Sequence, residues 1–188
     1  MIRLSTPSTF VWASIALCSI ARADEGVPAS SFPRGTFSLS LEADYAHSFD
    51  LSRARIESGT VGVGYYLFDN IALDAEVAGF AVQQAGPEST ISEMDFRIRH
   101  HLINSGKFSF FLDFGAGVSY ANTRTPATGT QFNYVLQPGL GATWELRDHV
   151  YLMAGARYWH LSNARLEGPL RNPSINANEG YVGVLVTF

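Results

Sequence analysis

The feature that most constrains this chain is a two-residue alternation of apolar and polar side chains, which recurs along most of the sequence after Thr36. In residues 36–45 every odd position is apolar, and every even position is Thr, Ser, Glu or Asp. A period of two places alternate side chains on opposite faces of a β-strand. No stretch shows a convincing helical period. The pattern therefore predicts an all-β protein.

Eight segments carry this pattern, and the connections between them alternate in length. Short links lie near 69–70, 104–107 and 146–149, whereas longer polar links lie near 47–53, 83–91, 123–131 and 163–178. All tight turns then fall at one end of the strand array and all long loops at the other, as in outer-membrane barrels. The expected strands are 36–45, 54–68, 71–82, 92–103, 108–122, 132–145, 150–162 and 179–188.

Two all-β architectures fit this alternation of apolar and polar residues. A soluble barrel of lipocalin type would turn its apolar face inward, whereas a membrane barrel would turn it toward lipid. The apolar faces run for about ten residues, the length that a tilted strand needs to cross hydrocarbon. The last strand also ends in Phe188, with Val182, Val184 and Val186 on the same face, which resembles the C-terminal strand signal of bacterial outer-membrane proteins. We expect an eight-stranded antiparallel transmembrane β-barrel of the bacterial outer membrane.

The interior of such a barrel is just wide enough for side chains. We therefore expect a charged hydrogen-bonded network inside it and no diffusion pore. The residues expected there are Glu42, Asp44, Asp74, Glu76, Glu93, Asp95, Arg97, Arg99 and Arg157. Six aromatic residues near strand ends are expected to anchor the barrel at the membrane interfaces: Tyr65, Tyr66, Tyr120, Trp144, Tyr158 and Trp159.

The N-terminal residues have the pattern of an export signal. Residues 1–23 contain Arg3, an apolar stretch from Phe10 to Ala21, and a small-x-small triplet that ends at Ala23. This predicts a cleaved secretory signal peptide over 1–23 and a single barrel domain over 24–188. Cys18, the one cysteine of the chain, would leave with the signal.

Charge and histidine placement exclude two classes of ligand. The net charge is −4 and the 13 basic residues are scattered, so no positive surface for nucleic acid is expected. Neighbouring His100 and His101 point to opposite faces, and His47 and His149 fall at opposite ends of the barrel. No metal site and no cofactor are expected.

One pair of residues suggests chemistry. His160 and Ser162 follow the apolar parity of the seventh strand at its extracellular end, so both side chains would lie on the lipid-facing side. A serine becomes an effective nucleophile when a base takes its proton, and histidine suits that task. Glu179, which opens the expected eighth strand, is the best candidate to orient the histidine. Its parity is opposite to that of Val182, so a bulge near Gly180 or a position in the loop would have to rotate it into place.

The alternative is that His160 and Ser162 are interfacial residues that meet lipid headgroups.

The segment His160-Leu-Ser162-Asn163-Ala164, followed by Glu179-x-Tyr181 at the start of the last strand, resembles the lipid A 3-O-deacylase (PagL-type) family of outer-membrane esterases. The resemblance covers roughly residues 158–181. It implies Ser162 as nucleophile, His160 as base and Glu179 as the third member, with Asn163 and the adjoining Ala164 at the oxyanion hole. The longer loop over 163–178 departs from the family pattern.

The same resemblance implies lipid A of lipopolysaccharide as substrate, among the lipids of the outer membrane. Arg165 and Arg171 would then be candidates to contact lipid A phosphates, although solvated loop charges are the simpler interpretation. Two alternatives from other classes are a structural or adhesive eight-stranded barrel and an esterase that acts on another lipid. The oligomeric state stays open, and a homodimer is possible.

Overall fold

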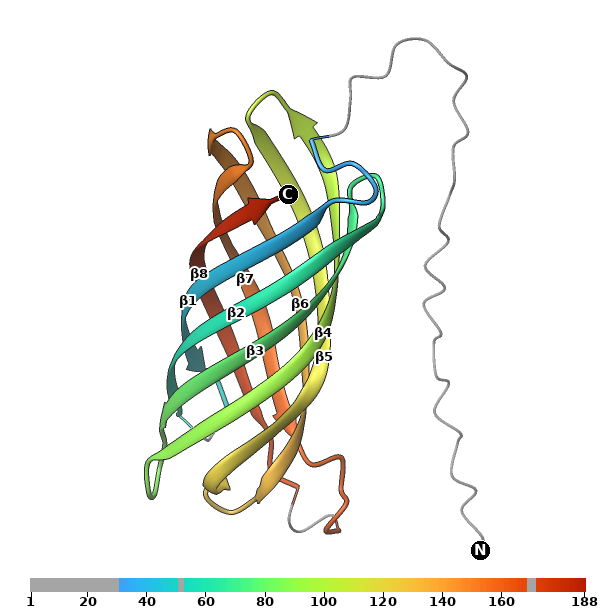
Figure 1. Cartoon of the computed structure of the whole chain (residues 1–188). Helices are drawn as coiled ribbons and strands as arrows, with labels where there is room; N and C mark the ends of the chain where they lie inside the picture. The colour runs from blue at the N-terminus through green and yellow to red at the C-terminus, as the bar shows by residue number, and fades with distance from the viewer. Residues whose placement is uncertain (1–30, 51–52, 169–171) are drawn as a thin grey trace, which may run out of the picture.

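The computed structural model describes residues 31–50, 53–168 and 172–188. The predicted signal peptide over 1–23 lies outside the described residues. The described part folds as one closed antiparallel barrel, in which each strand pairs with its neighbours in the chain and β8 closes the ring on β1 (Figure 1). The strands are β1 (Phe37–Ser48), β2 (Arg55–Phe68), β3 (Ile71–Gln83), β4 (Ser89–Ser105), β5 (Phe108–Thr125), β6 (Thr130–Arg147), β7 (Val150–Ser162) and β8 (Ile175–Thr187).

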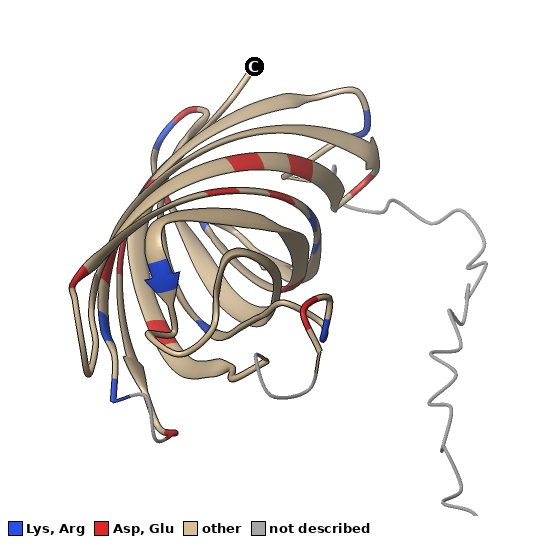
Figure 2. Ribbon diagram, turned by 90° about the horizontal axis from the view of Figure 1, so that it is seen from below, with Lys and Arg blue, Asp and Glu red and all other residues tan. Residues whose placement is uncertain are grey.

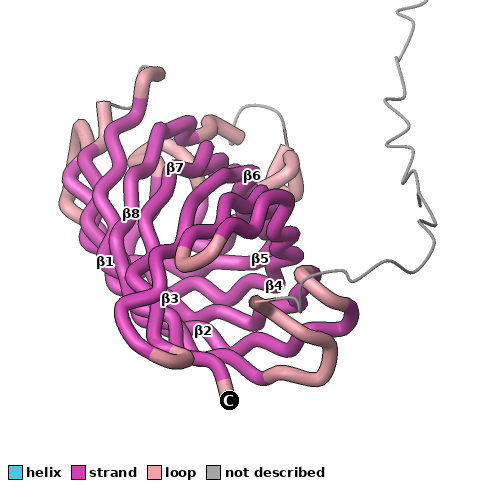
Figure 3. Tube along the Cα trace, turned by 90° about the horizontal axis from the view of Figure 1, so that it is seen from above, coloured by secondary structure: helices cyan, strands magenta, loops and turns pink. Residues whose placement is uncertain are grey.

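The eight-stranded antiparallel barrel confirms the predicted fold, and seen end-on its strands enclose a ring (Figure 3). The main difference lies at β8, which begins at Ile175 rather than at Glu179. Residues 175–178 pair with the end of β7 and extend the last hairpin. Among the described residues, no helix could span a membrane.

The two ends of the barrel differ as the connection lengths predict. The tight turns and the C-terminus lie at the top of Figure 1, and the longer loops lie at the bottom. Asn70 and His149 stand in two of the tight turns with φ of 67° and 64°, the left-handed conformation that such turns require. In outer-membrane barrels short turns are periplasmic and long loops extracellular, so the bottom of Figure 1 is the extracellular end.

The outer surface of the barrel is apolar. Leu41, Val77 and Met94 expose 63%, 60% and 52% of their surface, although each lies in the middle of a strand. Their sequence neighbours point inward and are buried, so the apolar face is the outer one. This orientation excludes the lipocalin-type barrel, whose apolar face would point inward. An apolar outer face is what a barrel needs when the hydrocarbon core of a membrane surrounds it.

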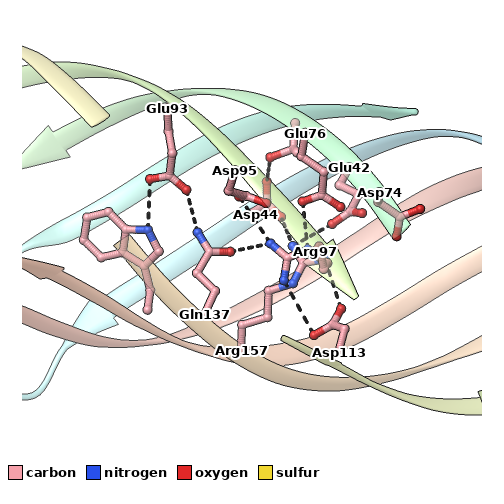
Figure 4. Close-up of polar contacts among 12 residues, drawn as sticks. Glu42, Asp44, Asp74, Glu76, Glu93, Asp95, Arg97, Asp113, Gln137 and Arg157 are labelled. Atoms are coloured by element: carbon pink, nitrogen blue, oxygen red, sulfur yellow. Dashed lines mark hydrogen bonds and ion pairs between the residues drawn. The ribbon is translucent and has the colours of Figure 1, made fainter. Parts of the chain in front are cut away.

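The middle of the interior is a charged layer (Figure 4). Arg97 Nε lies 2.9 Å from Glu76 Oε2, and Arg157 Nη1 lies 2.8 Å from Glu42 Oε2. All nine charged residues predicted to fill the interior are buried there, and Asp113 and Glu179 join them. Seen from the loop end, acidic positions recur on several strands around the ring (Figure 2).

Apolar and aromatic side chains close the interior on both sides of the charged layer. On the extracellular side Trp159, Phe80 and Leu161 belong to one buried cluster. On the periplasmic side Phe32 precedes β1 and packs against Tyr66 and the imidazole of His101, whose ring centroid lies 3.8 Å away. Two of the six predicted interface anchors are therefore placed differently. Tyr66 and Trp159 are only 1% and 0% exposed, because each follows an outward-facing Tyr and so takes the inward parity.

Candidate active site on the outer face of the last hairpin

His160 and Ser162 end β7 on its outward-facing side. They share the parity of Leu152, which is exposed, and lie two and four residues beyond Tyr158, the last exposed aromatic of the strand. Both are half-buried. His160 Nε2 and Ser162 Oγ are 3.1 Å apart, within hydrogen-bond distance. The contact that the spacing predicts is thus present.

The partner on the other side of the imidazole is Asn176. It faces His160 directly across the β7–β8 pairing, and its Oδ1 lies 2.7 Å from His160 Nδ1. Cross-strand partners project from the same face of a sheet, so Asn176 also lies on the outer side. The sequence prediction missed this residue because it assigned residues 163–178 to a loop. The alternation of Ile175, Ala177 and Glu179 with Asn176 and Asn178 could have revealed the extra stretch of pairing.

Glu179 does not reach His160, which corrects the prediction for the third residue. β7 and β8 keep one continuous register from Val150↔Val186 to Leu161↔Ile175, so no bulge near Gly180 rotates the chain. Glu179 therefore keeps the inward parity and is 4% exposed. Its Oε1 lies 3.6 Å from Nη1 of Arg157, the residue opposite it in register. It belongs to the interior charge network.

The Asn176 side chain is held on several sides. Its Nδ2 donates to Asp50 Oδ2 at 3.0 Å and lies 3.1 Å from Ser174 Oγ. Its Oδ1 also accepts from the hydroxyl of Tyr158 at 2.5 Å. These contacts come from β7, from the segment that leads into β8 and from the loop between β1 and β2, so three parts of the chain fix one amide.

The hydrogen bonds define the protonation pattern of His160. An amide oxygen can only accept, so the 2.7 Å contact between Asn176 Oδ1 and His160 Nδ1 matches the tautomer in which Nδ1 carries the proton. In the neutral imidazole Nε2 then has a free lone pair, and Ser162 Oγ donates to it. This is the arrangement in which an imidazole can take the proton of a serine as that serine attacks.

The residues after Ser162 form a tight turn. Ala164 and Arg165 both have positive φ, 51° and 65°, and Arg165 N donates to Asn163 Oδ1 at 2.9 Å. Asn163 is 2% exposed, whereas Arg165 is exposed. Arg171 lies outside the described residues. The turn thus ends β7 directly after Ser162 and presents the backbone of residues 163–165 beside it.

A hollow of about 470 Å³ opens among the four extracellular loops. Its wall includes Asp50 and Ser174, the two groups that hold the Asn176 amide from the loop side. In the part of the chain that the structure describes, no group of three or more His, Cys, Asp or Glu is arranged to hold a metal ion.

The family of this chain follows from comparison with known proteins. The family model described as lipid A 3-O-deacylase (PagL) matches residues 90–184, half of the chain. The chain belongs to the PagL family of lipid A deacylases. The matched residues run from the start of β4 nearly to the end of β8 and include His160, Ser162 and Asn176. No curated protein gives a significant match to this sequence.

Solved structures of outer-membrane barrels share the fold. Neisserial surface protein A is similar with a TM-score of 0.61 and 16% identity, over 81% of this chain and 96% of that one. The outer-membrane enzyme PagL is similar with a TM-score of 0.57 and 14% identity, over 77% of this chain and 97% of that one. With the family match and the apolar outer surface, these neighbours identify a bacterial outer-membrane barrel.

Proposed function

We propose that this PagL-family barrel is an esterase that removes the 3-O-linked acyl chain from lipid A, with Ser162 as nucleophile, His160 as base and Asn176 in the place expected for Glu179. The observation that carries the proposal is the hydrogen-bonded row Ser162–His160–Asn176 on the outer face of the barrel, inside the residues that match the family. A row of nucleophile, base and orienting group is the arrangement that acyl transfer uses on many unrelated folds.

The reaction would run through an acyl-serine. Ser162 Oγ attacks the ester carbonyl while His160 Nε2 takes its proton, which gives a tetrahedral intermediate and an imidazolium. Collapse of the intermediate breaks the ester bond, and the imidazolium returns the proton to the oxygen of the leaving sugar. Water, activated by the same imidazole, then hydrolyses the acyl-serine and regenerates the enzyme.

The turn after Ser162 is the part of the site suited to the oxyanion. Backbone N–H groups aimed at a developing negative charge typically lower the barrier, and loss of one such donor costs about 3 kcal/mol. We assign this role to the backbone around Asn163 and Ala164. The buried Asn163 side chain supports the turn through its bond to Arg165 N.

The outward position of the site fits a membrane lipid as substrate. His160 and Ser162 lie at the extracellular end of β7, where the outer leaflet surrounds the barrel, so lipid A could reach them by lateral diffusion without a pore. Arg165 is exposed just beyond Ser162. Its guanidinium is suited to a phosphate of the bound lipid A.

The test is the release of 3-hydroxy fatty acid from purified lipopolysaccharide by the refolded protein in detergent. We expect release by the wild type and none above background by Ser162→Ala. Ser92→Ala, which removes an exposed serine from the outer face of β4, is the matched control and should retain full activity. Release of acyl chains only from phospholipid would instead support an esterase that acts on another lipid. No release from either lipid would favour a structural or adhesive barrel.

A further inference from the structure

We propose that Asp50 is a positioning residue of this site: its carboxylate fixes the orientation of the Asn176 amide and thereby the tautomer of His160. This role rests on the proposed esterase function. Asp50 lies in the loop between β1 and β2, outside the residues that match the family model. Its carboxylate contacts Asn176, and it would act on His160 through that residue.

The loop that carries Asp50 is fastened to the first residues of β8. Asn176 N donates to Asp50 Oδ2 at 2.6 Å, and Phe49 N donates to Asn176 O at 3.0 Å. The ring of Phe49 lies 6.0 Å from the ring of Tyr158 on β7. Backbone and side-chain contacts therefore hold the carboxylate within reach of the Asn176 side chain.

The need for such a residue follows from the chemistry of an amide. Asparagine can present either its oxygen or its NH2 group to a histidine, and only the oxygen requires a proton on Nδ1. In serine proteases, replacing the triad aspartate by asparagine lowers kcat about 10⁴-fold, because the amide favours the wrong tautomer. An asparagine in this position therefore needs something that prevents the wrong orientation.

Asp50 meets this need because an ionised carboxylate can only accept hydrogen bonds. The 3.0 Å contact to Asp50 Oδ2 is satisfied when Nδ2 faces Asp50, which leaves Oδ1 facing His160 Nδ1 at 2.7 Å. Ser174 Oγ adds a second partner for Nδ2. The negative charge of Asp50 also polarises the amide toward His160, which favours the imidazolium formed during attack.

The test compares Asp50→Ala in two backgrounds. In the wild type we expect kcat for acyl release to fall at least about 10-fold, with the wrong-tautomer cost of about 10⁴-fold as the upper limit, and KM to change little. In an Asn176→Asp background a carboxylate faces His160 directly and cannot adopt a wrong orientation. There Asp50→Ala should leave kcat unchanged or raise it, because it also removes the repulsion between two neighbouring carboxylates.

Two further variants keep the experiment decisive. Asp50→Asn retains an acceptor oxygen without the charge and should fall between the wild type and Asp50→Ala. Asp148→Ala removes an exposed carboxylate at the opposite end of the barrel and should behave as the wild type. Heat-modifiable migration on gels verifies that each barrel is folded.

The possible failures can be told apart. If the wild type releases no acyl chain, the proposed function fails and this role fails with it. If the wild type is active and Asp50→Ala matches it, the role alone is overturned. An equal loss from Asp50→Ala in both backgrounds would show that Asp50 only anchors its loop, and would also overturn the role.

Discussion

At the scale of single residues, the proposed catalytic site depends on whether each side chain points into the barrel or out toward lipid. Parity along β7 predicted that His160 and Ser162 would point outward together, and the 3.1 Å contact confirms that they meet. Parity along β8 also placed Glu179 on the inward-facing side, away from His160. The continuous register shows that no bulge rotates it outward. The prediction missed Asn176 because a segment rich in Asn, Ser and Pro resembles a loop, although the alternation over residues 175–179 continues the strand and the pairing with β7 extends β8 to Ile175.

This assignment predicts opposite outcomes for two substitutions on β8. Asn176→Ala removes the acceptor for His160 Nδ1 and should lower kcat by between about 10-fold and about 10⁴-fold. Glu179→Gln alters only an interior side chain 3.6 Å from Arg157 and should leave kcat within about threefold of the wild type, since it removes no group of the site. Initial rates of fatty-acid release measure both. A large loss from Glu179→Gln in a folded barrel would restore the glutamate as the orienting group.

At the scale of elements, the last hairpin is shaped by close packing around Tyr181. This ring lies inside the barrel opposite Gly155, and Gly155 pairs in turn with Gly141 on β6. A Cβ added at either glycine would meet the Tyr181 phenol and backbone carbonyl oxygens at distances that real contacts do not show. The guanidinium of Arg157 stacks on the ring, 4.0 Å from its centroid. The alternation of the sequence predicted which strands form. It did not predict that glycines on the two neighbouring strands make space for the Tyr181 ring.

Gly155→Ala should therefore destabilise the barrel, at a cost typical of overpacking, about 1–3 kcal/mol. Gly180→Ala is the matched control in the facing strand, because its added Cβ would meet nothing within 4 Å. Urea unfolding of the refolded proteins in detergent, followed by tryptophan fluorescence, measures the difference. Equal stability of the two variants would contradict the packing described for Tyr181.

At the scale of the whole molecule, the barrel is an apolar shell around a charged middle layer with aromatic and aliphatic layers on both sides. The sequence predicted the shell and the charged residues, because both follow from alternation. It did not predict the layers, since parity says which residues point inward but not which of them meet across the interior. Arg97, Arg99 and Arg157 come from two strands, and their contacts extend to carboxylates on β1, β3 and β5.

Removing one of these arginines should cost more than removing an exposed one. Arg157→Met removes the cation that lies 2.8 Å from Glu42 and that also pairs with Asp44 and Glu179. Breaking a buried ion pair typically costs about 3–5 kcal/mol. Arg147→Met, at the exposed end of β6, should change the free energy of unfolding by less than about 0.5 kcal/mol. The same urea titrations compare them. If the Arg157→Met barrel were as stable as the wild type, the interior ion pairs would contribute no net stability.

The most direct test of the central claim is the mass spectrum of lipid A from a Gram-negative strain with intact lipid A that expresses this protein. Both the wild type and Ser162→Ala must be present as folded barrels in the outer membrane. With the wild type, we predict that lipid A loses the mass of one 3-linked hydroxyacyl chain, and that it keeps its full mass with Ser162→Ala. Unchanged lipid A with both proteins would contradict the deacylase assignment, and equal loss with both would contradict Ser162 as the nucleophile.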